Sequence, residues 1–381
     1  MKPILRRIAA LYLFCASTSA LGGGFSVGYN EAWFVYNYPN WLASNPYYYT
    51  NPPFNFSSNF GVLPNPAPGT TLSVIDTYFA AMAEGNAKIV RLWLFPGLQG
   101  ILLDLSKPAG SQTQGLTPDF LNPNKTCGNL NTVLLSAKNH GLTVYLTALN
   151  ANDMAAAVAT PLQAYFVNLL NDSAERIAFK SNVLGPLLSC LNQFNASYPN
   201  VVYGLDLINE IEAALNSNYF SASWVGARNF IQDMATFVRS KSPWLRISAS
   251  AGYSEAVLEI TLGLFSGLGL NFYDVHVYAD GGQYPGVTWL CNKVLADHVP
   301  LILGEYGQKS QIVDDGLQYW TTANFLYGAK TNCFSAALAW KYEDPIQPWL
   351  AYFTIPDPIN NPNKGTFRPA YYLIQYYGSL N

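Results

Sequence analysis

The chain has 381 residues, of which 50% are hydrophobic and only 11% are charged. This composition excludes a disordered chain, and the length suits one large domain or two domains of ordinary size. The formal net charge is −3 and the chain has no basic cluster, which excludes nucleic acid as a partner.

The first twenty residues have the features of a secretory signal peptide. Their basic residues are Lys2, Arg6 and Arg7. A short apolar run over 8–15 follows, and the small residues after it predict cleavage after Ala20. Cys15 leaves a lipoprotein open, although the residues before it are bulkier than a usual lipobox has. We therefore expect a mature chain over 21–381 that is secreted or periplasmic, with no segment long enough to cross a membrane.

Short apolar runs rich in β-branched and aromatic residues recur along the mature chain, and longer amphipathic stretches separate them. Such runs predict strands that are buried on both faces of a sheet. They cover 25–29, 88–93, 142–147, 201–207, 245–249, 272–277, 300–303 and 336–339. The amphipathic stretches predict helices over 72–87, 130–140, 220–240, 313–330 and 369–377.

Eight strands that alternate with helices predict an α/β fold, a single-domain (β/α)8 TIM barrel with long βα loops. The two longest loops, 30–68 and 95–127, follow the first and second strands. A doubly wound open sheet is the alternative, but the chain has no glycine-rich dinucleotide or P-loop fingerprint to support it.

Four cysteines remain in the mature chain, and an even number in an exported protein permits two disulfides. They are Cys127, Cys190, Cys291 and Cys333. Three connectivities are open, and we favour the pairs Cys127–Cys190 and Cys291–Cys333 because each is closer in the chain. Four buried thiols are the alternative.

Polar and aromatic side chains gather at the predicted C-terminal ends of the strands, where barrel enzymes carry their catalytic groups. In chain order they are Arg91, Asn150, Asn209, Glu210, His276, Tyr278, Glu305 and Trp340. Two carboxylates on different strands are what glycoside hydrolysis requires. One acid protonates the departing oxygen, and the other carboxylate attacks the anomeric carbon or stabilises its cation. A satisfied ion pair or a solvated loop position is the alternative for each glutamate.

These strand ends resemble those of clan A glycoside hydrolases, and among them most closely family 5, the cellulases and mannanases. The motifs are Leu-Ile-Asn-Glu at 207–210, Ile-Leu-Gly-Glu-Tyr-Gly at 302–307, Val-Arg-Leu-Trp at 90–93, Asp-Val-His-Val-Tyr at 274–278 and Ala-Trp at 339–340. Their order, with the glutamates on the fourth and seventh strands, carries the resemblance.

The resemblance implies a retaining enzyme that cleaves a β-linked polysaccharide or oligosaccharide, of the endo-glucanase or mannanase type. Glu210 would be the acid/base and Glu305 the nucleophile. Asn209 would hold the 2-hydroxyl group of the cleaved sugar, and Trp340 would be the floor on which this sugar stacks.

The two glutamates need opposite protonation states. The resemblance implies that Arg91 and Tyr278 keep Glu305 ionised, and a neighbouring guanidinium and phenol should lower the pKa of a carboxylate. Glu210 must stay protonated near neutral pH, which needs an apolar setting or a nearby negative charge. We expect His276 to orient another residue rather than to react itself.

Two features lie beside this pattern. The aromatic residues Trp33, Trp41 and 47–49 are candidates to line further subsites, with ordinary packing as the alternative. Many family 5 members have a histidine near the end of the third strand, where this chain has Asn150, which supplies hydrogen bonds but no positive charge. This departure keeps other clan A families, such as family 39, open.

Two rival functions come from other classes. A family 18-like chitinase is suggested by the spacing of Asp206 and Glu210, but Tyr203 and Ile208 stand where its motif has aspartates. A catalytically inactive barrel that only binds polysaccharide is the second. A metal hydrolase is disfavoured because the three histidines form no HxH or HExxH motif, so we expect no metal or cofactor. We expect a monomer with a polysaccharide or oligosaccharide substrate.

Overall fold

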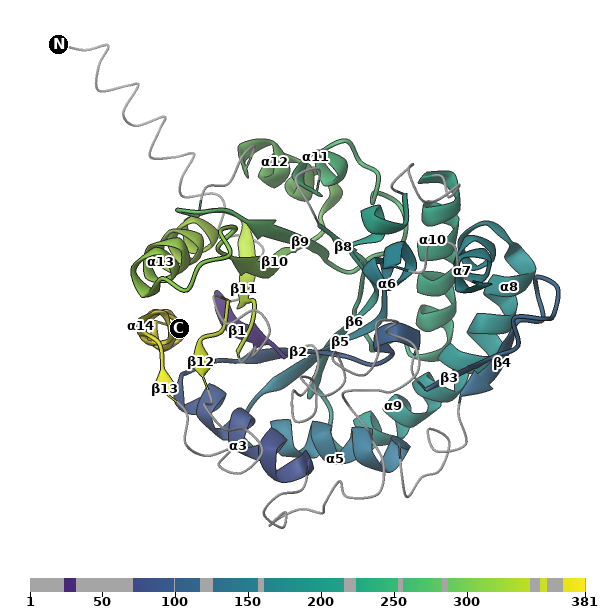
Figure 1. The fold of residues 1–381 in the computed structure, drawn as a ribbon, viewed down its shortest axis with the longest axis horizontal. Helices are drawn as coiled ribbons and strands as arrows, with labels where there is room; N and C mark the ends of the chain where they lie inside the picture. The colour runs from purple at the N-terminus through teal and green to yellow at the C-terminus, as the bar shows by residue number, and fades with distance from the viewer. Residues whose placement is uncertain are drawn as a thin grey trace.

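Parallel strands form a barrel in the computed structural model, and helices surround it (Figure 1). The structure describes residues 24–31, 71–98, 100–116, 126–156, 161–215, 224–252, 256–282, 287–342, 350–354 and 366–380. The predicted signal peptide and the aromatic residues Trp33, Trp41 and 47–49 lie outside these residues.

The barrel sheet has the strand order β7-β6-β5-β2-β1-β11-β10-β9-β8, and all its neighbouring strands are parallel. The strands are β1 (Ser26–Asn30), β2 (Ile89–Trp93), β5 (Thr143–Asn150), β6 (Val202–Asn209), β7 (Ile247–Ser248), β8 (Ser250–Ala251), β9 (Tyr273–Tyr278), β10 (Leu301–Gly307) and β11 (Phe334–Ala339). Only Ala249 separates β7, which pairs with β6, from β8, which pairs with β9. These two pieces act as one interrupted strand that joins both ends of the sheet. The predicted (β/α)8 barrel is confirmed, and each predicted strand is present.

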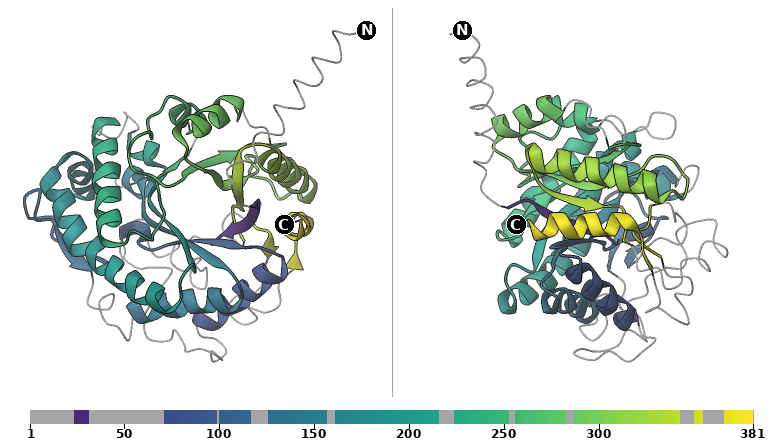
Figure 2. Two further views of the ribbon diagram at one scale, coloured as in Figure 1. Left: turned by 180° about the vertical axis from the view of Figure 1, so that it is seen from behind. Right: turned by 90° about the vertical axis from the view of Figure 1, so that its left-hand side faces the viewer.

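The helices form the outer layer. They are α3 (Thr71–Glu84), α5 (Thr126–Asn139), α7 (Pro161–Asn171), α8 (Ser173–Phe179), the π-helical turn η3 (Lys180–Leu184), α9 (Gly185–Ser197), α10 (Trp224–Lys241), α11 (Ala256–Thr261), α12 (Val287–Asp297), α13 (Asp315–Thr331) and α14 (Pro369–Ser379). The five predicted helices are confirmed, and α14 lies beside α13 and packs against β1 (Figure 2). Among the described residues, no helix has the length and hydropathy needed to cross a membrane.

Shorter elements lie at the rim of the barrel. They are the turns η2 (Pro96–Leu98) and η4 (Ile211–Leu215), helix α6 (Ala151–Ala156), and the antiparallel strand pairs β3 (Ile101–Leu103) with β4 (Thr113–Leu116) and β12 (Phe353–Thr354) with β13 (Thr366–Phe367). The prediction of an irregular loop over 95–127 is therefore wrong in part, because β3 and β4 form a hairpin there. Glu175 of α8 fastens this hairpin by accepting hydrogen bonds from three of its backbone N–H groups.

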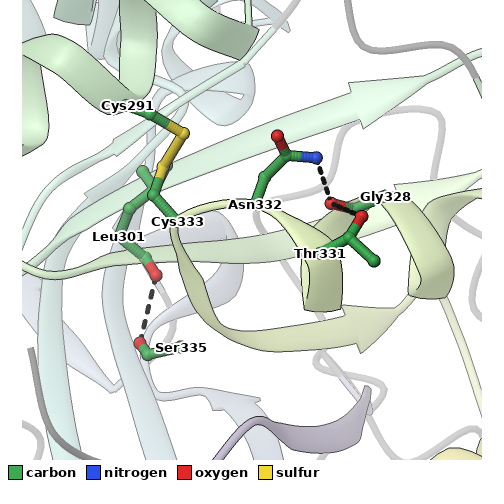
Figure 3. The surroundings of a disulfide bond; sticks show 7 residues. All are labelled: Cys291, Leu301, Gly328, Thr331, Asn332, Cys333 and Ser335. Carbon is green, nitrogen blue, oxygen red and sulfur yellow. Dashed lines mark hydrogen bonds between the residues drawn. A yellow bond between two sulfur atoms is a disulfide. The ribbon is translucent and has the colours of Figure 1, made fainter. Parts of the chain in front are cut away.

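Both favoured disulfides are present. Cys127 of α5 bonds to Cys190 of α9, and Cys291 of α12 bonds to Cys333 directly before β11 (Figure 3). These bonds close loops of 63 and 42 residues in the chain, which restricts the unfolded state. The alternative of four buried thiols is excluded.

The interior of the barrel is apolar at one level and polar at the next. A cluster of apolar side chains inside the sheet contains Ile89, Tyr145, Phe272, Ile302 and Leu338. Alternate residues of a strand face the same side, so Arg91 lies one layer beyond Ile89 toward the C-terminal end of β2. Glu305 also lies in this polar layer. The pairing of β10 with β9 shifts its register between Leu303 and Glu305. Parallel pairing thus gathers the polar strand ends at one rim.

Candidate active site

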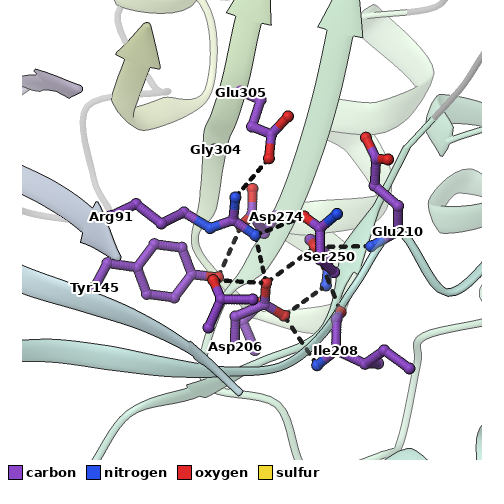
Figure 4. A network of polar contacts seen from close by, with 12 residues as sticks. Arg91, Tyr145, Asp206, Ile208, Glu210, Ser250, Asp274, Gly304 and Glu305 are labelled. Atoms are coloured by element: carbon purple, nitrogen blue, oxygen red, sulfur yellow. Dashed lines mark hydrogen bonds and ion pairs between the residues drawn. The ribbon is translucent and has the colours of Figure 1, made fainter. Parts of the chain in front are cut away.

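Arg91 is the centre of the polar layer, and its side chain is fully buried. Its Nη1 donates to Glu305 Oε1 at 2.5 Å and to Asn30 Oδ1 at 3.1 Å. Its Nη2 donates to Asp206 Oδ2 at 2.6 Å (Figure 4). The same Nη2 donates to Asn209 Oδ1 at 2.8 Å. Burial alone would lower the pKa of Arg91, but the two carboxylates raise it, so that the guanidinium stays charged. One cation therefore ties together the ends of β1, β2, β6 and β10.

Asp206 holds Arg91 from the floor of the site, and we did not predict this role. Besides Arg91, Asp206 accepts hydrogen bonds from the Ser250 backbone and hydroxyl groups, both at 3.1 Å. Burial raises the pKa of Asp206, although the charge of Arg91 opposes the increase. An acidic residue inside the otherwise apolar run 202–208 was the sequence signal for such a buried charge.

Asp274 is a second buried carboxylate beneath the site. Tyr145 donates its hydroxyl to Asp274 Oδ2 at 2.7 Å, and His276 Nε2 lies 3.7 Å from Asp274 Oδ1. A Cβ at position 304 would lie only 1.9 Å from Asp274 Oδ1. Gly304 is therefore needed for β10 to pass this carboxylate, which explains the glycine before Glu305.

Glu305 has the two partners that the resemblance implies. Besides the ion pair with Arg91, Tyr278 donates its hydroxyl to Glu305 Oε2 at 2.7 Å. The pKa direction that we predicted is nevertheless wrong. Burial raises the pKa of Glu305, and the charges of His276 and Arg91 only partly offset this increase. The side chain of Glu305 is only 4% exposed, which explains why burial is the larger effect.

Glu210 follows β6 directly, and its backbone has a positive φ of 49°, a conformation that non-glycine residues rarely adopt. Its Oε1 lies 3.0 Å from His276 Nδ1, and its Oε2 accepts a hydrogen bond from Asn152 Nδ2 at 2.7 Å. Burial raises the pKa of Glu210, but the hydrogen bond and charge of His276, the hydrogen bond from Asn152 and the charge of Arg91 together outweigh it, so that the net shift is downward. The predicted protonated state of Glu210 in the free protein is therefore wrong.

His276 lies between the two glutamates, because its Nδ1 is also 3.5 Å from Glu305 Oε1. Burial would lower the pKa of His276, but Glu305, Asp274 and Glu210 raise it to about 10. The imidazole of His276 is thus a cation near neutral pH. The proton that we expected on Glu210 lies on His276 instead. The prediction that His276 only orients another residue stays a prediction, although its Nδ1 lies within reach of both glutamates.

The two glutamates and the histidine form one compact group. One ligand atom from each of Glu210, His276 and Glu305 lies within 4.8 Å of the other two. Such a group has the donor atoms for a metal ion, but the Arg91 guanidinium 2.5 Å from Glu305 opposes a second cation. Two carboxylates at this spacing, with a proton donor between them, suit nucleophilic attack by one carboxylate and acid/base catalysis by the other on neighbouring atoms of one bond.

Asparagine side chains line the rim beside Glu210. Asn209 Nδ2 donates to Asn150 Oδ1 at 3.1 Å, and Asn150 Nδ2 donates to Asp153 Oδ1 at 3.1 Å. Asn150 thus supplies hydrogen bonds, as predicted, but it reaches Asn209 rather than a glutamate. Asn152, which we did not single out, makes the contact with Glu210 instead. Its only sequence signal was its place beside Asp153, two residues after the end of the third predicted strand at Asn150.

Aromatic side chains form one wall of the site. Trp340, Trp93 and Leu350 make a buried apolar cluster, and Tyr278 packs against it. The rings of Trp93 and Trp340 lie 5.9 Å apart, and Trp340 is 7% exposed. Tyr278 joins this wall to Glu305 by its hydroxyl group. The wall therefore offers an apolar surface next to that carboxylate.

Gly252 sets the space available to Glu210. A Cβ at position 252 would lie 2.4 Å from Glu210 Cγ and 2.5 Å from Glu210 Oε1. We expect Gly252→Ala to displace the Glu210 side chain and to lower kcat by about tenfold or more, because small misplacements of catalytic groups are costly. Gly185→Ala is the control, since the nearest atom to its added Cβ would lie at 3.4 Å. Steady-state kinetics and melting temperatures of both variants give the measurement. A Gly252→Ala protein with wild-type kcat would contradict this role.

Comparisons with known proteins identify the fold. No protein-family model matches the chain, and no curated protein matches its sequence. A β-mannanase from the blue mussel Mytilus edulis has 16% identity and a TM-score of 0.56, covering 86% of this chain and 90% of its own. The β-1,4-mannanase of the sea hare Aplysia kurodai has 17% identity and a TM-score of 0.54, with 84% and 88% covered. The endo-1,4-β-D-mannanase of Thermotoga petrophila RKU-1 has 14% identity and a TM-score of 0.56, with 94% and 100% covered. The chain therefore shares the barrel fold of these enzymes over nearly its whole length.

Proposed function

We propose that the protein is a retaining glycoside hydrolase of the mannanase type. It cleaves β-linked mannan at internal bonds of the polysaccharide, which is endo cleavage. The observation that carries this proposal is that Glu210 and Glu305 lie at the ends of β6 and β10. One carboxylate oxygen of Glu210 lies within 4.8 Å of a carboxylate oxygen of Glu305. Retaining enzymes hold their two carboxyl groups about 5–5.5 Å apart, whereas inverting enzymes leave room for a water molecule. The mannanases that share the fold supply the substrate class.

In the first step, Glu305 attacks the anomeric carbon, and the bond to the leaving oxygen breaks. Glu305 must be ionised for this attack. The ion pair with Arg91 at 2.5 Å and the hydroxyl of Tyr278 at 2.7 Å stabilise its charge against the effect of burial. The product of this step is a covalent glycosyl-enzyme.

The leaving oxygen receives its proton from Glu210. In the free protein this proton lies on His276 Nδ1, which is 3.0 Å from Glu210 Oε1. A bound sugar excludes water and disfavours the separated charges, so the proton moves to Glu210. In the second step, Glu210 accepts a proton from the water that releases the sugar from Glu305. The proton then returns to His276, and the cycle balances.

The sugar at the cleavage point lies between Asn209 and Trp340 in this proposal. Asn209 is held by Arg91, which donates to its Oδ1, and by Asn150, which accepts from its Nδ2. The Trp93–Trp340 wall beside Glu305 supplies the apolar surface that the face of a pyranose ring needs. Trp33 remains a candidate for a further subsite.

The rival functions fit the contacts less well. In a family 18-like chitinase, Asp206 would assist Glu210, but here Asp206 binds Arg91 and Ser250. A barrel that only binds polysaccharide does not require a second carboxylate and a charged histidine beside Glu210.

We also propose that the enzyme is exported with cleavage after Ala20 and acts as a monomer. The two disulfides agree with an oxidising compartment.

A panel of polysaccharides tests the proposal. We expect activity on β-mannan above that on cellulose, xylan, mixed-linkage glucan, β-1,3-glucan and chitin, with oligosaccharides as the first products. NMR of the first-formed product should show the β-anomer, because two displacements at one carbon retain its configuration. Release of mannose alone would contradict endo cleavage, and a first-formed α-anomer would contradict the retaining mechanism. Turnover of chitin alone would favour the chitinase.

A further inference from the structure

A chain of hydrogen-bonded side chains leads from Arg91 in the polar layer to Asp153 on α6. Arg91 Nη2 donates to Asn209 Oδ1 at 2.8 Å, and Asn209 Nδ2 donates to Asn150 Oδ1 at 3.1 Å. Asn150 Nδ2 then donates to Asp153 Oδ1 at 3.1 Å. All four residues are buried, and we call them the amide chain. The mechanism above uses Arg91 and Asn209 but gives Asp153 no part.

The two ends of the amide chain dictate the direction of its hydrogen bonds. A guanidinium has only donors, so the oxygen of Asn209 must face Arg91. An ionised carboxylate only accepts, so the nitrogen of Asn150 must face Asp153. The two amides then have one arrangement that satisfies every bond, in which Asn209 donates to Asn150. Asn150 Oδ1 also accepts a hydrogen bond from the backbone N–H of Asn152 at 3.2 Å, which supports the same orientation.

Asp153 is itself held by the backbone of a neighbouring loop. Its Oδ2 accepts a hydrogen bond from the Gly97 N–H in the turn η2 at 2.7 Å. Burial raises the pKa of Asp153 to about 7, although the hydrogen bonds from Gly97 and Asn150 oppose the increase. Asp153 is therefore an ionised acceptor above neutral pH, and each of its two oxygens has its own donor.

We propose that Asp153 is a positioning residue, which fixes the amide of Asn209 through Asn150 and thereby presents an N–H group to the 2-hydroxyl of the cleaved sugar. This inference rests on the function proposed above. An amide nitrogen has two hydrogens, and Asn209 uses one of them for Asn150. The other can then donate to the oxygen of the 2-hydroxyl group. Hydrogen bonds to this hydroxyl strengthen in the transition state of glycoside hydrolysis, so a turned amide would slow the reaction.

Asp153→Asn tests the amide chain at about pH 8, above the pKa of Asp153. Asparagine keeps an oxygen for the Gly97 N–H, but its nitrogen then faces the nitrogen of Asn150, and no arrangement satisfies the whole chain. We expect kcat/KM to fall about tenfold or more on an aryl β-mannoside, but less than about threefold on its 2-deoxy analogue, which lacks the hydroxyl. Asp104→Asn, whose hydrogen bond with Ser106 is exposed, is the control and should keep wild-type kinetics. An equal loss on both substrates would overturn the positioning role.

Exchanging the two side chains should restore the amide chain. In the double variant Asn150→Asp with Asp153→Asn, the amide at position 153 donates to the carboxylate at position 150. This carboxylate still accepts from Asn209 and from the backbone of Asn152, and the net charge is unchanged. We expect kcat/KM on the aryl β-mannoside to return to within about threefold of the wild type. A double variant that is no faster than Asp153→Asn would overturn the inference.

Melting temperatures test the amide chain without a substrate. Asn150→Asp alone places two carboxylates side by side, and Asp153→Asn alone places two amide nitrogens side by side. The exchange removes both conflicts. Its melting temperature should therefore exceed the sum of the two single changes by about 2 °C or more. Additive changes would overturn the amide chain. If the wild type cleaved no glycan, the proposed function would fail, and the melting temperatures would still decide on the chain.

Discussion

We expect Glu305→Gln to lower kcat on mannan by about 10^4-fold or more, the scale seen when an enzyme loses its nucleophile. Glutamine has nearly the same shape, and its oxygen still accepts a hydrogen bond from Arg91. It cannot form the covalent bond to the anomeric carbon, because the amide is a far weaker nucleophile than the carboxylate. Initial rates on mannan and on an activated aryl mannoside should both fall, since both substrates use the same nucleophile.

The matched control for this variant is Glu84→Gln, the same substitution at an exposed position at the end of α3. Its kcat should equal that of the wild type. Calorimetry with a manno-oligosaccharide separates catalysis from binding, because Glu305→Gln should retain the ligand that it no longer cleaves. Wild-type turnover of Glu305→Gln would exclude Glu305 as the nucleophile and would leave the role of its ion pair with Arg91 as purely structural.

Most of the fold could be predicted because the barrel strands have a strong local signal. Each is a short apolar run, and the helices predicted over 220–240 and 369–377 bury one apolar face. The helices over 161–197 were not among those predicted from the sequence. In the structure α8, η3 and α9 follow one another without a break, and Pro186 lies just after the π-helical turn η3. The hairpin of β3 and β4 was not predicted, because the hydrogen bonds that stabilise its turn and β4 go to Glu175 of α8, which lies far from it in the sequence.

The positions of the catalytic candidates could be predicted from topology alone. Parallel strands end at one rim, so polar residues at strand ends must meet there. Their protonation states could not be predicted, because these depend on distances across the barrel. His276 reaches both Glu210 and Glu305, and burial of Glu305 outweighs the charge of Arg91. The same limit applies to Asp206 and Asn152, whose partners come from other strands and loops.

Glu210→Ala should separate the two steps of the reaction. On mannan, whose leaving oxygen needs a proton, we expect kcat to fall by about 10^2- to 10^4-fold. An aryl mannoside with a strongly acidic phenol needs no proton to leave, so its first step should stay fast. The second step should become slow because no base activates water. A burst of phenol equal to the enzyme concentration, followed by slow turnover, is the expected result. Glu84→Ala, at the exposed end of α3, should show wild-type steady-state rates.

Azide then tests which glutamate is the acid/base. This anion needs no base, and in Glu210→Ala it can enter the space of the missing carboxylate and attack the glycosyl-enzyme. We expect azide to restore turnover of the aryl mannoside and to give a β-mannosyl azide, with the configuration of the substrate. If Glu210 were instead the nucleophile, azide would take its place in a single displacement and the product would be the α-azide. The anomer of this one product therefore distinguishes the two carboxylates, although both lie within 4.8 Å of His276 and of each other.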